Sequence, residues 1–96
     1  MARRKEMSKA KQELLKKQAM ISVIRSVIND IEWSYNNAAE QLDNTMLNFK
    51  EFQEEYTGDE PIEDNYGYRD YLATIEERQT TLEAYEAVQN ALLKLI

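Results

Sequence analysis

Acidic side chains form the densest groups of residues with the potential for chemistry in this sequence. Carboxylates alone can hold Mg²⁺ or Ca²⁺, but neither group has the ligand spacing and central glycine of an EF-hand loop. We therefore expect solvated charge here and no metal site. The two groups are Glu51, Glu54, Glu55 and Asp59, Glu60, Glu63, Asp64.

Histidine and cysteine are both absent. The usual general base, the usual zinc ligand and all thiolate chemistry are therefore missing. No Gly-rich phosphate loop and no activated nucleophile accompanies the carboxylates. We expect a protein that is not an enzyme and binds no cofactor.

One segment resembles an enzyme helix. Residues Ile24-Arg25-Ser26-Val27-Ile28-Asn29-Asp30-Ile31 are similar to the Leu-Arg-x-x-Ile-Asp opening helix of the helical chorismate mutases. That family uses further cationic side chains downstream to bind a dicarboxylate. The matching positions here carry Leu42 and Gln53, so the resemblance does not extend to the substrate-binding residues.

The distribution of Gly and Pro predicts one all-α domain over residues 1–96. Neither residue occurs between 5 and 56, whereas Gly58, Pro61 and Gly67 cluster in the next segment. This pattern predicts a helix of about 50 residues at 5–56, a loop at 57–67 and a helix of about 29 residues at 68–96. A single loop between two helices predicts an antiparallel hairpin.

A seven-residue repeat predicts coiled-coil-like packing between the two helices. In the second helix, Arg78 and Gln89 interrupt the apolar seam, either fixing its register or lying at its edge. In the first helix, position a of the repeat is occupied by Met7, Leu14, Ile21, Ile28, Tyr35, Leu42, Phe49 and Tyr56, and position d by Ala10, Lys17, Ile24, Ile31, Ala38, Thr45 and Phe52. The second helix carries Tyr68, Tyr71, Leu72, Ile75, Leu82, Tyr85, Leu92 and Ile96.

Unequal helix lengths predict uncovered apolar surface. At about 1.5 Å per residue, the helices are roughly 75 Å and 43 Å long, so the second covers only about Ile28 to Tyr56. Trp33 and Leu47 at position f face away from the seam, and exposed Trp side chains are common at interfaces. We therefore predict that a helical protein partner binds Met7, Leu14, Met20, Ile21, Val23, Val27, Trp33 and Leu47.

Two other arrangements remain open. Asn36-Asn37-Ala38-Ala39-Glu40 contains a capping-box-like Asn-x-x-Glu, and a break there would allow a self-contained three-helix bundle. The aromatic residues near the loop (Tyr56, Tyr66, Tyr68 and Tyr71) are expected to form a small core at the end of the hairpin, or else a recognition patch.

Charge is strongly asymmetric along the chain. Residues 1–20 carry seven basic and two acidic side chains, whereas the remainder carries five basic and sixteen acidic ones. This asymmetry favours opposite-charge association and leaves a homo-oligomer as an alternative. The acidic majority argues against nucleic acid as a partner. No apolar run is long enough for membrane insertion, and the basic start lacks the apolar core of a signal peptide.

The hairpin pattern, without Cys or catalytic residues, resembles the WXG-like small proteins of type VII secretion, in particular the helical partners of LXG toxins in Gram-positive bacteria. Trp33-Ser34-Tyr35 lacks the Gly of the family's Trp-x-Gly turn. The segment from Tyr66 to Asp70 fits the export pattern Tyr-x-x-x-Asp/Glu, placed before the second helix. The resemblance implies a targeting factor or chaperone that binds a toxin's helical N-terminal domain, with a second small helical protein as a further partner. It implies cytoplasmic action, and co-secretion without a cleaved signal peptide.

Overall fold

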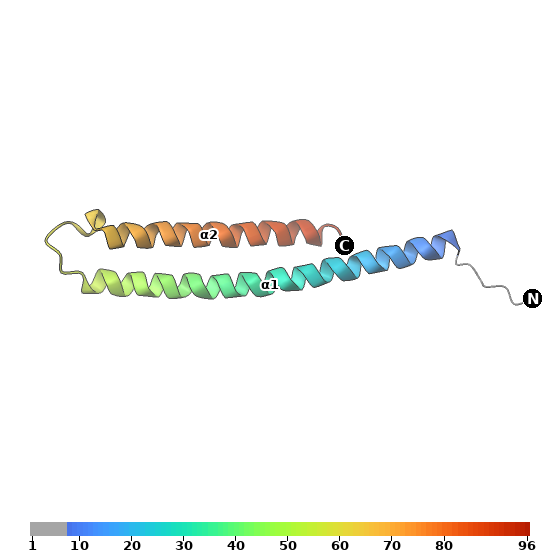
Figure 1. Cartoon of the computed structure of the whole chain (residues 1–96), viewed down its shortest axis with the longest axis horizontal. Coiled ribbons are helices and arrows are strands. Elements are labelled where there is room, and N and C mark those ends of the chain that lie inside the picture. The colour runs from blue at the N-terminus through green and yellow to red at the C-terminus, as the bar shows by residue number, and fades with distance from the viewer. Residues whose placement is uncertain (1–7) are drawn as a thin grey trace, which may run out of the picture.

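The computed structural model describes residues 8–96 and contains two long helices joined by one loop (Figure 1). Helix α1 spans Lys9–Glu55, and helix α2 spans Tyr66–Leu93. A short 3₁₀ turn, η1, occupies Ile62–Asp64. The helices run antiparallel and pack against each other, which confirms the predicted all-α hairpin. The beginning predicted for the first helix, near residue 5, and the predicted partner residue Met7 lie outside the described part.

Helix α1 is continuous for 47 residues. It begins after Ser8, whose hydroxyl accepts a hydrogen bond from the backbone N–H of Lys11 at 3.1 Å. This is the capping bond that favours Ser at a helix start. The helix passes through Asn36 and Asn37 without a break, so the three-helix alternative is wrong. The heptad keeps its phase through these residues, and packing against α2 outweighs the local capping signal.

Helix α2 begins two residues earlier and ends three residues earlier than the sequence predicted. The Asn65 side chain accepts hydrogen bonds from the backbone N–H groups of Gly67 at 2.8 Å and Tyr68 at 3.4 Å. This cap makes Gly67 part of the first turn and not the last loop residue. A Cβ at Gly67 would lie 3.2 Å from the Phe52 ring, so its small size suits the close approach of the helices.

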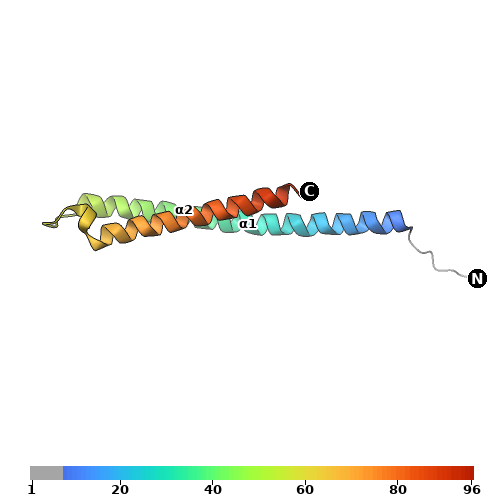
Figure 2. The same cartoon turned by 90° about the horizontal axis from the view of Figure 1, so that it is seen from above.

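The interface follows the predicted heptad closely. In α1 every a and d residue from Ile21 to Tyr56 is at least half-buried, and Ile28 and Leu42 are the most buried at 8% exposed each. Figure 2 shows the helices crossing obliquely along their length, as in coiled-coil packing. Leu72 and Ile96, which the sequence placed in the seam, are both 44% exposed, so that part of the prediction is wrong. The half-buried residues of α2 include Tyr68, Tyr71, Ile75, Arg78, Leu82, Tyr85, Gln89 and Leu92.

Aromatic rings close the loop end of the hairpin. Phe49 packs on Tyr68 and Tyr71 with ring centroids 5.2 and 5.5 Å apart, and Phe52 packs on Tyr71 at 5.4 Å and on Tyr56 at 6.1 Å. These distances suit tilted aromatic pairs. The expected small core therefore forms, but without Tyr66, which is 82% exposed at the start of α2.

The molecule is far more extended than a domain built around a central core. Its radius of gyration is 24.2 Å, whereas a compact chain of this length has a value of about 12–13 Å. No residue among 8–96 has a fully buried side chain. One seam between two helices is thus the whole core, and most of each helix surface faces solvent.

Candidate partner-binding surface

The N-terminal part of α1 projects beyond the end of α2 (Figure 1). All residues from 9 to 20, which we call the overhang, are exposed. Its length is about 18 Å at about 1.5 Å per residue. Leu14 is 54% exposed although it occupies an a position of the same repeat that is buried at Ile28 and Leu42. Leu14 therefore continues the seam of α1 where α2 no longer covers it, between Ala10 and Lys17 at the neighbouring d positions.

A second apolar surface lies beside this seam. Met20, Val23 and Val27, which we call the apolar flank, are 63%, 63% and 40% exposed. Ile21, by contrast, is half-buried, so the prediction that it is wholly uncovered is wrong. Leu95 and Ile96, which follow α2, are also exposed and apolar. A free end of the hairpin with this composition is a typical protein-interaction surface.

The outer face of α1, formed by Trp33 and Leu47, points away from α2. The two side chains are 71% and 56% exposed, as their f positions predict. Glu40 lies between them at the intervening f position and is exposed. The outer face is thus two separate apolar side chains on a polar background.

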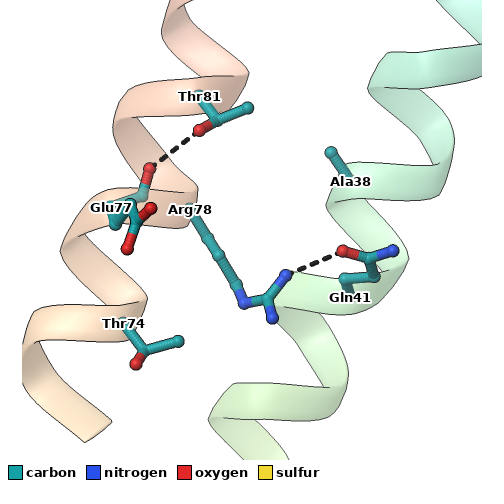
Figure 3. A pocket seen from close by; sticks show the side chains of 6 residues that line it. All are labelled: Ala38, Gln41, Thr74, Glu77, Arg78 and Thr81. Atoms are coloured by element: carbon teal, nitrogen blue, oxygen red, sulfur yellow. Dashed lines mark hydrogen bonds between the residues drawn. The ribbon is translucent and has the colours of Figure 1, made fainter. Parts of the chain in front are cut away.

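Arg78 lies in the seam and not at its edge. Its Nη1 donates a hydrogen bond to Oε1 of Gln41 at 2.7 Å across the helices (Figure 3). Its Nε is buried without a hydrogen-bond partner. Figure 3 also shows the polar and small side chains that line the shallow cavity here, namely Ala38, Gln41, Thr74, Glu77, Arg78 and Thr81.

The Arg78–Gln41 bond fixes the axial register of the hairpin. Four turns of helix separate Gln41 from Val27, and four turns separate Arg78 from Leu92 in the opposite direction. Val27 therefore lies level with the last turn of α2. Met20 and Leu14 lie beyond it, which explains why their exposure is high.

The candidate export motif lies within α2, whereas the sequence predicted that it would come before the second helix. Tyr66 is the first residue of α2, and Asp70 follows one turn later; both are exposed. Arg69 between them donates to the backbone carbonyl of Glu63 at 3.2 Å and forms an exposed ion pair with Asp64 at 3.6 Å. Tyr66 and Asp70 thus share one accessible helical face next to η1.

Acidic residues do not gather into a metal site in the part of the chain that the structure describes. The loop carboxylates instead contribute to a raised pKa of Tyr56. Partial burial, followed by the nearby charge of Glu60, raises the pKa of Tyr56 above its ordinary value of 10.0, with smaller contributions from Asp64 and Glu63. The Tyr56 hydroxyl donates to the backbone carbonyl of Glu60 at 2.8 Å, which ties the loop to the end of α1.

Several exposed apolar residues are absent from the predicted binding set. Leu15 and Met46 on α1 and Leu72 on α2 are 43%, 48% and 44% exposed. Leu15 occupies a b position and Met46 an e position beside the seam, whereas Leu72 was predicted to lie in the seam and is exposed instead. The axial register of the two helices was needed to separate them.

Residues 8–96 contain no helix that is long and apolar enough to cross a membrane. The chain matches no protein-family model, and comparison with curated proteins and with solved structures finds no match. The likeness to the WXG-like proteins is thus limited to a two-helix antiparallel hairpin. What the molecule displays is an extended hairpin with exposed hydrophobic and aromatic side chains, consistent with binding a protein partner.

Proposed function

We propose that this protein is a non-catalytic helical adaptor or chaperone, which completes a helical bundle with the helical region of another protein. The observation that carries the proposal is the uncovered heptad seam of the overhang. An apolar a position such as Leu14 contributes to stability only when another helix packs on it. The free chain leaves it in water.

The partner that the hairpin architecture favours is the helical N-terminal domain of an LXG-type toxin, with a second small helical protein completing the bundle. This part of the proposal rests on the resemblance of the sequence to WXG-like proteins. In this role the protein binds its partner in the cytoplasm and is exported with it without a cleaved signal peptide. Tyr66 and Asp70, exposed on the first turns of α2, are then available to the export machinery.

Co-expression with the products of the neighbouring genes tests this proposal. The parent chain is expected to co-purify with a long helical protein at fixed stoichiometry. Ile21→Asp places a charge where the half-buried seam meets the overhang, and Trp33→Ala removes the large side chain of the outer face, so both should weaken the complex. Glu83→Ala, an exposed substitution on α2, is the matched control. If both variants bind as the parent does, the proposed surface is wrong.

A homo-oligomer is the second candidate, because the charge of the chain is divided between a basic start and an acidic remainder. In this arrangement the basic end of one copy lies on the acidic half of its neighbour. Light scattering at low and high salt distinguishes the two candidates. A homo-oligomer held by these charges dissociates as salt rises, whereas the adaptor is monomeric alone under both conditions.

A further inference from the structure

We propose that the overhang binds an acidic amphipathic helix that lies in line with α2, beginning where α2 ends. This inference rests on the proposed adaptor function and adds the position and the charge of the partner helix. It is carried by three features of residues 9–27: an exposed a position in the overhang, a hollow at the edge of the seam and a basic edge.

The position follows from the continuity of the seam. The seam of α1 is at least half-buried as far as Ile21, and the last helical residue of α2 is Leu93. At the end of this covered part, half-buried Ile21 and then Leu14, which is 54% exposed, occupy the same a positions that bury Ile28 and Leu42 under α2. A helix placed on them therefore continues the packing geometry of α2 and requires no rearrangement of α1.

A hollow at the edge of the seam leaves room for a side chain of the partner helix. A shallow hollow on α1 is lined by Gln18, Ile21, Ser22 and Arg25. These residues occupy positions e, a, b and e of the repeat, so the hollow flanks the seam on the edge that also carries Lys11. A second, wholly apolar hollow lies on the other side of the seam and is lined by Ala19, Met20, Val23 and Ile24.

The charge of the partner follows from the edge of the seam. Lys11 and Arg25 occupy e positions on either side of Gln18, and Lys17 occupies a d position. From residue 9 to residue 25 the only acidic side chain is Glu13. Charged residues at such edges choose the partner helix by complementarity. A helix with Glu or Asp along its edges meets these cations favourably, and a basic helix is repelled.

The same charges disfavour a second copy as the occupant. The segment of a second copy that has an open seam is its own overhang, and pairing two overhangs brings Lys11, Lys17 and Arg25 of each copy together. In the acidic parts of a second copy the seam is already buried within the hairpin, because α1 and α2 cover each other there. An acidic helix from a different protein satisfies both the seam and the charge.

Two synthetic peptides test the inference on the full-length chain. Both are fluorescein-labelled and three heptads long, with Leu at a and d; one carries Glu and the other Lys at all e and g positions. Fluorescence anisotropy is expected to show that the Glu peptide binds at least about tenfold more tightly than the Lys peptide at low salt. The difference should narrow at high salt, because these edges are exposed.

Two variants locate the binding. Ile21→Asp should abolish binding of the Glu peptide, and the double variant Lys11→Glu/Arg25→Glu should reverse the preference in favour of the Lys peptide. Circular dichroism establishes that each variant keeps its helix content. Lys50→Glu, which changes an exposed charge far from the overhang, should leave the preference unchanged.

The outcomes separate this inference from the proposed function. Equal affinity for both peptides overturns the charge claim and leaves a helix-binding overhang in place. Absence of binding by either peptide overturns the inference and removes the main support for the adaptor function. Self-association at low salt that protects residues 9–20 from hydrogen exchange overturns the inference in favour of a second copy.

Discussion

The same substitution at two a positions should have very different effects on the free protein. Leu42 is 8% exposed between the helices, whereas Leu14 is 54% exposed on the overhang. Leu→Ala at a buried site costs about 2–5 kcal/mol from lost burial and the cavity left behind. Because a two-helix seam collapses more easily than a closed core, we expect Leu42→Ala to cost about 2–3 kcal/mol.

Leu14→Ala removes no packing in the free chain. Ala also has a slightly higher helix propensity than Leu, so the expected change is within about 0.5 kcal/mol. Urea unfolding followed by circular dichroism at 222 nm measures both values, and two protein concentrations detect any contribution from association. If Leu42→Ala unfolds the chain outright, loss of helical signal in buffer records the same result.

Packing of the overhang in the free protein would refute this expectation. A Leu14→Ala cost similar to that of Leu42→Ala would mean that the overhang is packed in the free protein, and the reasoning from its exposure would fail. In the presence of the Glu peptide, Leu14 should become buried in a helix interface, as Leu42 already is in the free chain. Leu14→Ala should then weaken binding, because the peptide buries the side chain that water surrounds in the free chain.

Three further predictions concern the hairpin itself. Arg78→Leu should raise stability by about 1 kcal/mol in urea unfolding, because a buried Nε without a partner is replaced by apolar packing; a loss of stability would show that the bond to Gln41 outweighs packing. Phe49→Ala should lower the free energy of unfolding by about 2 kcal/mol and open the aromatic end of the hairpin. Faster hydrogen exchange in the first turns of α2 would detect this opening, whereas Tyr66→Ala should change neither the stability nor the exchange rate. The raised pKa of Tyr56 means that the folded state favours the neutral phenol: its contribution is present below pH 10.0 and is lost as pH rises through the higher folded pKa. Thermal melts at pH 9 and pH 11 should therefore show a smaller loss of stability for Tyr56→Phe than for the parent, and an equal loss would contradict this assignment.

The seven-residue repeat determined the fold from sequence. Every a and d residue of α1 from Ile21 to Tyr56 is where the repeat placed it, and Trp33 is exposed as its f position requires. This succeeds because side chains on a helix have a fixed period, so apolar spacing alone defines the face that must be covered. The unequal lengths of the helices followed from the placement of Gly58 and Pro61, which predicted the exposed end that the proposals depend on.

Tertiary packing decided what the local signals left open. Asn36-Asn37 offered a helix start, but the seam on either side keeps α1 continuous, and the Asn65 cap places Gly67 inside α2. Sequence left open whether Arg78 lies in the seam or snorkels at its edge, because both fit the same spacing. Only the axial register of the two helices, set by contacts such as Arg78–Gln41 and Phe49–Tyr71, determines which side chains are covered and which remain available to a partner.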